Sequence, residues 1–110
     1  MTGQALNDFY RIAQTVLQID YLGRELIIEC GGANGVTIQT ALTEGAWGSA
    51  VLTVQRSNDG QVWYALASPT TISSDSITSV TPDTQFLRVY VSTAGSAADK
   101  VRVTAYSRLS

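Results

Sequence analysis

The residues that could carry chemistry in this chain are few, and histidine is not among them. Its absence removes the usual general base of enzymes, the usual partner of a nucleophile and the commonest metal ligand. The single cysteine, Cys30, lies in the run RELIIEC, where alternation puts it on the apolar face of a predicted strand. A thiol in that position is a small buried hydrophobic group and not a nucleophile. A lone cysteine also cannot form an internal disulfide.

The carboxylates Glu25 and Glu29 share one face of the same predicted strand. Glycoside hydrolysis needs two carboxyl groups about 5–10 Å apart, whereas four residues of extended chain separate this pair by about 13 Å. We interpret them as solvent-exposed charges or as ion-pair partners of Arg24. The sequence also lacks the glycine-rich phosphate-binding motifs and the GxSxG nucleophile motif. We therefore predict that the protein is not an enzyme and has no catalytic residues, no metal and no cofactor.

The segment Ser57-Asn58-Asp59-Gly60 separates two apolar runs and could be either a ligand site or a turn. A calcium loop of the EF-hand type needs several carboxylates at alternate positions and a distal glutamate. Only Asp59 is available here. Asp-Gly between alternating apolar runs is a strong hairpin signal, because glycine adopts positive φ without steric cost. The sequence predicts a turn.

The elements that must position these residues follow a period of two from about residue 24 onward. Apolar and polar residues alternate in RELIIEC, AVLTVQR, FLRVYVS and KVRVTAYSR, which is typical of strands with one face in a core. Turn residues separate the runs, so we predict an all-β protein, an antiparallel β-sandwich of jelly-roll or immunoglobulin-like order. Strands are expected at 24–30, 36–41, 50–57, 62–66, 70–73, 76–80, 86–93 and 100–108. The expected core contains Leu52, Val54, Leu87, Val89, Val91, Val101 and Val103.

The first 22 residues have a different pattern, with apolar residues at helical spacing. These residues are Leu6, Phe9, Tyr10, Ala13 and Leu17. Asn7 or Asp8 could cap a short helix that begins there. We divide the chain into a short N-terminal helix or extended arm at 1–22 and a single β-sandwich domain at 23–110. Two interpretations stay open for the first segment: a helix or strand packed on its own sandwich, or an arm laid on a neighbouring subunit.

Aromatic and apolar residues near the N-terminus and the loops are the candidate contact residues. Trp63 adjoins the Asp-Gly turn, and we predict it in the core. Trp47 lies between two glycines in GAWGS and could be either a lid on the core or part of a contact surface. The candidate interface residues are Leu6, Phe9, Tyr10, Ile12 and Trp47.

Composition narrows the class of partner. The chain has 110 residues, 15% of them charged, and a formal net charge of −2. This charge gives no basis for binding nucleic acid or an anionic membrane, and no apolar run is long enough to span a bilayer. The N-terminus lacks the pattern of a secretory signal, so we expect synthesis in a cytoplasm. Six arginines against one lysine favour a surface that contacts other protein, where arginine is enriched and lysine depleted.

The stretch WGSAVLTVQRSNDGQVWYAL, followed by FLRVYVSTAG and KVRVTAYS, resembles a pattern in small β-sandwich virion proteins of tailed phages. The likeness covers about Trp47 to Tyr106. It implies a capsid decoration (cement) protein or a head-fibre type module, made in the host cytoplasm and located on the capsid surface of the virion. Its implied partner is the major capsid protein, with neighbouring capsomers clamped together.

Two further expectations accompany this resemblance. The same signature occurs in β-sandwich modules that bind glycans, so the alternative is a carbohydrate-binding module of a phage fibre or secreted enzyme. Sheet edges with few charges also need cover from another chain. A closed homo-oligomer, most simply a homotrimer, would provide it.

Overall fold

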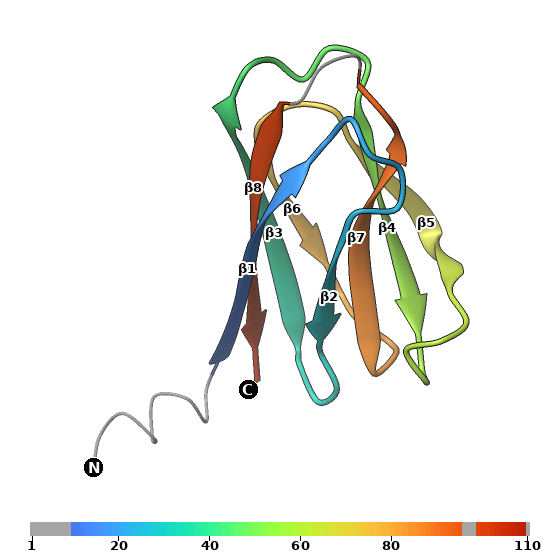
Figure 1. Cartoon of the computed structure of the whole chain (residues 1–110). Helices are drawn as coiled ribbons and strands as arrows, with labels where there is room; N and C mark the ends of the chain where they lie inside the picture. The colour runs from blue at the N-terminus through green and yellow to red at the C-terminus, as the bar shows by residue number, and fades with distance from the viewer. Residues whose placement is uncertain (1–9, 96–98, 110) are drawn as a thin grey trace.

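The computed structural model describes residues 10–95 and 99–109, and within them eight strands form two four-stranded sheets (Figure 1). The strands are β1 (Tyr10–Gln18), β2 (Glu25–Glu29), β3 (Gly35–Glu44), β4 (Val51–Ser57), β5 (Tyr64–Ile72), β6 (Ser76–Val80), β7 (Phe86–Thr93) and β8 (Lys100–Arg108). The sheets have the orders β1-β8-β3-β6 and β2-β7-β4-β5, and every neighbouring pair is antiparallel. Alternation of the chain between two such sheets is the topology of a jelly roll. The predicted antiparallel β-sandwich is confirmed.

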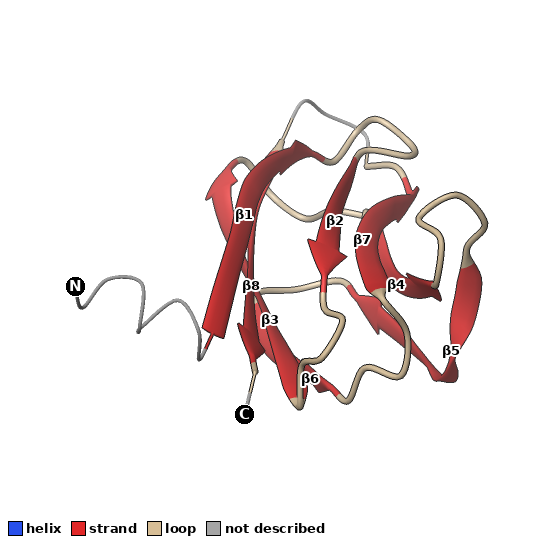
Figure 2. Cartoon of the chain, turned by 90° about the horizontal axis from the view of Figure 1, so that it is seen from below, coloured by secondary structure: helices blue, strands red, loops and turns tan. Residues whose placement is uncertain are grey.

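The core lies between the two sheets, which face each other in the view from below (Figure 2). Alternate residues of each central strand point into it, as a period of two requires. All the predicted core positions are buried, namely Leu52, Val54, Leu87, Val89, Val91, Val101 and Val103. Further buried residues complete the same cluster, including Ile19, Ile28, Ile38 and Ile72.

Two of the predicted strands, 62–66 and 70–73, are one strand in the structure, β5. The register against β4 shifts where Val54 pairs with Thr70 while Gln55 pairs with Ala65. The residues between Ala65 and Thr70 form the irregularity, and they include Pro69. Proline has no N–H to donate, so it is tolerated at an edge strand or a bulge. Because β5 is the edge of its sheet, the residues around the proline can stay unpaired, and the strand pairs with β4 again at Thr70.

The predicted N-terminal helix is wrong where the structure describes the segment, since residues 10–18 are the strand β1. This strand pairs with β8 along its whole length. Leu17 is buried and Ala13 packs against the core, while Ile12 and Val16 are exposed on the outward side. Apolar residues on both faces of a strand imitate helical spacing, which explains the error. Within residues 10–95 and 99–109 no helix is long and apolar enough to cross a membrane.

Candidate binding faces of the sandwich

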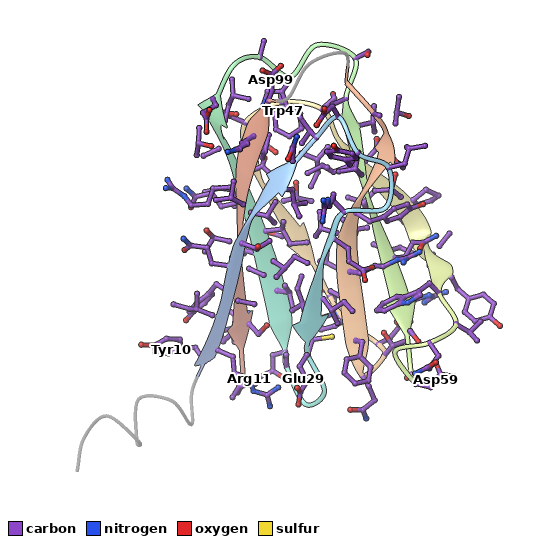
Figure 3. All side chains as sticks on the ribbon, in the orientation of Figure 1. Tyr10, Arg11, Glu29, Trp47, Asp59 and Asp99 are labelled. Carbon is purple, nitrogen blue, oxygen red and sulfur yellow. The ribbon has the colours of Figure 1, made fainter. Side chains whose placement is uncertain are left out.

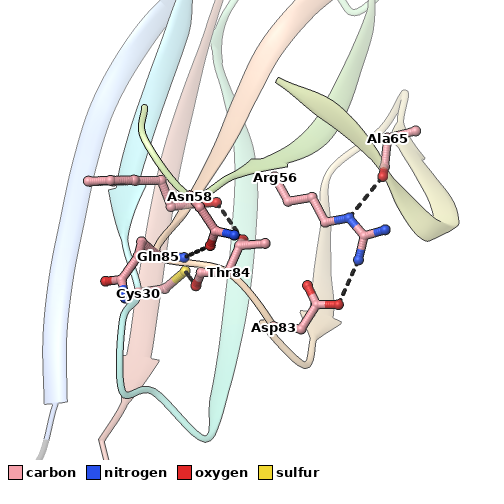
Figure 4. A network of polar contacts seen from close by, with 8 residues as sticks. Cys30, Arg56, Asn58, Ala65, Asp83, Thr84 and Gln85 are labelled. Atoms are coloured by element: carbon pink, nitrogen blue, oxygen red, sulfur yellow. Dashed lines mark hydrogen bonds and ion pairs between the residues drawn. The ribbon is translucent and has the colours of Figure 1, made fainter. Parts of the chain in front are cut away.

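Cys30 lies at the lower end of the sandwich and is buried. Its Sγ–H donates to the carbonyl oxygen of Thr84 at 3.4 Å (Figure 4). Burial raises the pKa of this thiol, and the nearby positive charge of Arg11 offsets only part of that effect. The thiolate, which is the reactive form, is therefore disfavoured. The side chain contributes packing to the core, as the sequence predicted.

The Asp59 segment is a turn, as predicted, and its polar groups are used internally. Gly60 has a φ of 73°. The carboxylate of Asp59 accepts the N–H groups of Gln61 and Val62 at 2.9 and 3.0 Å and the hydroxyl of Ser57 at 2.9 Å. These hydrogen bonds hold the pKa of Asp59 below its usual value, with the Val62 N–H as the largest cause. In the described part of the chain, no three metal-ligating side chains gather at one place.

Glu25 and Glu29 lie on the outward side of β2 and have separate roles. Glu25 pairs with Arg88 at 3.0 Å, not with Arg24, the partner predicted from the sequence. The backbone carbonyl of Glu29 accepts a hydrogen bond from Arg11 of β1 at 3.0 Å. Figure 3 shows Arg11 and Glu29 together at the lower end of the sandwich.

Trp47 lies at the opposite end of the sandwich from Tyr10 (Figure 3). It is half-buried, packs against the core and donates its Nε1–H to Asp75 at 2.8 Å. This bond, with a second from the backbone N–H of Leu42, holds the pKa of Asp75 below its usual value. Trp47 thus covers part of the core. This position agrees with the first of its two interpretations, a lid on the core. Of the candidate interface residues that the structure describes, it does not join Tyr10 and Ile12 on β1.

The remaining candidate interface residues divide between described and undescribed parts of the chain. Leu6 and Phe9 lie outside the described residues. Tyr10 and Ile12 lie on the outward side of β1, next to β8. The ring of Tyr10 packs on the ring of Tyr106 with centroids 5.5 Å apart and planes at 31°. Tyr106 is also the register partner of Ile12, so these three side chains form one patch.

This patch belongs to a larger surface on the outward side of the β1-β8-β3-β6 sheet, which we name the β1 face. It consists of Tyr10, Ile12, Val16, Ile77, Arg102 and Tyr106. The exposed fractions of Ile12, Val16, Ile77 and Tyr106 are 59%, 49%, 68% and 41%. A pocket of about 230 Å³ lies beside Tyr106, lined also by Thr37, Ser79 and Arg108. Apolar side chains that gather on one face of a sheet mark an interaction surface, unlike scattered ones.

Most of the charged residues of this sheet are basic. Its four strands carry Arg11, Lys100, Arg102 and Arg108 but a single acidic residue, Glu44. Glu44 lies at the end of β3 and pairs with Lys100 at 3.3 Å. Arg11 points toward the other sheet, where it donates to the carbonyl of Glu29, whereas Arg102 is the register partner of Val16 on the outward side. The β1 face therefore has apolar and basic side chains next to one another.

The opposite side of the sandwich has different chemistry. Four residues surround Arg88 on the outward side of the β2-β7-β4-β5 sheet. We name the five together the Arg88 cluster: Glu25, Gln55, Trp63, Arg88 and Tyr90. The guanidinium carbon of Arg88 lies 4.9 Å from the centroid of the Trp63 ring and 4.4 Å from that of Tyr90. Its Nε–H and Nη2–H donate to Oε1 of Gln55 at 2.9 and 2.6 Å. Arginine, aromatic and amide groups are thus locked in one arrangement.

The prediction that Trp63 lies in the core is wrong. Trp63 is half-buried and packs on Arg88 outside the core cluster. Tyr64, the next residue, pairs with Arg56, and Ala65 pairs with Gln55 on the outward side. Alternation therefore places Trp63 outward. The sequence does signal the outward positions of Arg88 and Tyr90 through FLRVYVS, but their meeting with Trp63 depends on the register of β4 with β5.

No protein-family model matches the sequence, and no curated protein matches it. Several solved structures share the fold. The SPBc2 prophage-derived protein YomS is 9% identical, with a TM-score of 0.58 over 88% of this chain and 94% of that one. The low-affinity xylan-binding module CBM86 from Roseburia intestinalis is 14% identical, with a TM-score of 0.56 over 92% and 96%.

Chitosan-binding module 1 of a chitosanase/glucanase from Paenibacillus sp. IK-5 is 18% identical, with a TM-score of 0.52 over 84% and 74% of the two chains. At these identities the likeness concerns the fold alone. The fold of this chain is therefore one shared by a prophage protein and by carbohydrate-binding modules.

Proposed function

We propose that this chain is a non-enzymatic structural protein of a phage virion, a capsid decoration protein that binds the outer shell and stabilises contacts between capsomers. The observation that carries the proposal is the β1 face. It presents Ile12, Val16 and Tyr106 to solvent from neighbouring strands. The likeness in fold to a prophage-derived protein is compatible with this assignment.

The chemistry of the β1 face defines the partner surface that it would fit. Its apolar side chains would be buried against the shell, and each such burial contributes favourable transfer free energy. Arg102 and Arg108, which lie beside them on β8, would meet acidic groups of the capsid protein, since complementary charge sets orientation and specificity. The proposed partner is therefore an apolar surface of the major capsid protein with acidic residues around it.

The proposal includes assembly as a homo-oligomer, most simply a trimer. The edge strand β1 is nine residues long and carries only one charged residue, Arg11. Long edges with little charge are open to pairing with another chain. A closed ring of copies would cover such edges while repeating the β1 face toward the shell.

Co-sedimentation with capsids tests the function, using Val16→Asp as the variant. A carboxylate at this position replaces apolar contact surface and lies opposite Arg102, its register partner on β8, so it also neutralises a positive charge of the proposed interface. We expect the apparent Kd for capsids to rise at least about tenfold, roughly 1.4 kcal/mol. The capsids should be assembled from a major capsid protein encoded in the same genome as this chain, and light scattering of the free protein should give the mass of a trimer.

Val62→Asp is the matched control, because Val62 is 53% exposed and Val16 is 49% exposed. Val62 lies in the turn between β4 and β5, away from the β1 face. We expect this variant to bind capsids like the unchanged protein. Equal loss of binding in both variants, or an unchanged Kd in Val16→Asp with normal thermal unfolding, would reject the β1 face as the attachment surface.

A second candidate function, carbohydrate binding, is favoured by one observation, the Arg88 cluster. Ligand sites combine aromatic surface with a few fixed polar groups, and this cluster supplies both on an outward sheet face. Two of the structures that share the fold are named as xylan-binding and chitosan-binding modules. The two candidates use opposite sides of the sandwich and are therefore separable by experiment.

A further inference from the structure

We propose that the Arg88 cluster binds a neutral glycan chain and discriminates against acidic ones. This inference rests on the second candidate function above and names its ligand class. The starting observation is that Trp63, just before β5, and Tyr90 of β7 both lie against Arg88 and both keep part of their surface exposed. The arrangement is a short aromatic row, with Arg88 against both rings, on the outward side of the sheet.

The aromatic row suits the apolar side of a sugar ring. The C–H groups of a pyranose pack on an aromatic surface, while its hydroxyls need fixed donors and acceptors at the edge of that surface. Gln55 and Glu25 flank Arg88 and provide amide and carboxylate oxygens in a fixed position. Ile27, which is the register partner of Arg88 on β2, adds exposed apolar surface.

The same contacts make Arg88 a poor receptor for an anion. Three of its N–H groups already donate, two to Gln55 and one to Glu25 at 3.0 Å. Its charge is balanced by Glu25. A sugar carboxylate or a phosphate would have to displace these partners, because bidentate recognition by arginine needs two free N–H groups on one side. Arg88 therefore orients the aromatic rings and the amide rather than pairing with a ligand.

A second acidic residue on this side of the sandwich also disfavours an acidic ligand. The outward side of β2 carries Glu29 as well as Glu25, so the two acidic residues outnumber the one arginine of the cluster. An acidic polymer that ran across β2 and β7 would meet Glu29 as a like charge. A neutral chain avoids this repulsion. The ligand class that fits the surface is a neutral polysaccharide.

The Arg88 cluster and the β1 face lie on different sheets, and both point away from the core. A copy attached to a shell through its β1 face would keep the cluster on its free side. One chain could then hold the shell with one sheet and a surface glycan with the other.

Affinity electrophoresis in native gels tests the inference. The gels contain soluble xylan, hydroxyethyl cellulose or polygalacturonic acid, and the matched variants are Tyr90→Ala and Tyr106→Ala. We expect the unchanged protein to be retarded by a neutral polymer and not by polygalacturonic acid. Tyr90→Ala should raise the apparent Kd for the neutral polymer at least about tenfold, as loss of an aromatic anchor does. Tyr106→Ala, on the β1 face, should leave it unchanged.

Each other outcome has a defined meaning. Retardation by polygalacturonic acid equal to that by the neutral polymers would overturn the ligand class while leaving carbohydrate binding in place. No retardation by any of the three polymers would overturn both. Trp63→Ala is the second variant in case Tyr90→Ala unfolds, since Trp63 lies outside the core. A Trp63→Ala protein that folds normally and still binds like the unchanged chain would reject the cluster as the site.

Discussion

Replacing Leu87 by Ala is expected to lower the free energy of unfolding by about 2–5 kcal/mol. Leu87 lies near the start of β7, is fully buried and is the register partner of Ile28 on β2 and Arg56 on β4. Its truncation removes buried methyl groups and leaves a cavity between the two sheets. The surrounding side chains can fill this cavity only in part, because the core is closely packed. Because small domains are stable by about 5–15 kcal/mol, the loss is a large share of the total. Urea unfolding followed by circular dichroism measures it.

Leu22→Ala is the control for this change. Leu22 lies between β1 and β2 and is 67% exposed, so the same truncation should change the free energy of unfolding by less than about 0.5 kcal/mol. Similar losses in the two variants would mean that β7 does not lie in the core, and the strand order of the sandwich would have to be revised.

Replacing Thr40 by Val is expected to cost about 1–3 kcal/mol of unfolding free energy, although the shape of the side chain hardly changes. Thr40 is a buried residue of β3. Its hydroxyl donates to the carbonyl oxygen of Ser74 and accepts the N–H of Ser76, both at 3.1 Å. Valine leaves both backbone groups without this partner at the start of β6. Thermal unfolding by calorimetry gives the difference.

Thr37→Val provides the comparison on the same strand. Thr37 is half-buried on the outward side of β3, where a methyl group is tolerated, and β-branched residues favour strands. We expect a change below about 0.5 kcal/mol. If both variants lost the same stability, the cost would come from the change of residue type and not from the hydrogen bonds of Thr40.

Most of the fold follows from the period of two in the sequence. The runs that became β4, β7 and β8 have apolar residues on one side only, so their faces and their burial could be predicted residue by residue. The Asp59-Gly60 turn was equally predictable, because positive φ at glycine and local hydrogen bonds from aspartate fix it without distant contacts. These signals are local, and a single sequence contains them in full.

The errors concern residues whose environment depends on pairing. β1 has apolar residues on both faces because one face meets the core and the other carries Ile12 and Val16 to the surface, and this pattern looks helical. The position of Trp63 depends on the irregular register between β4 and β5, which no local rule gives. The partner of Glu25 is Arg88, 63 residues away in the sequence. Strand order therefore assembles both candidate binding faces, and the sequence shows only their parts.

Hydroxyl-radical footprinting of the protein, free and bound to capsids, tests the central claim most directly. The claim is that attachment to the shell uses the β1 face and leaves the Arg88 cluster free. We predict that oxidation of Tyr10 and Tyr106 falls on binding, while oxidation of Trp63 and Tyr90 stays the same. Protection of Trp63 and Tyr90 with Tyr10 and Tyr106 unchanged, or a protein that shows no association with capsids, would contradict it.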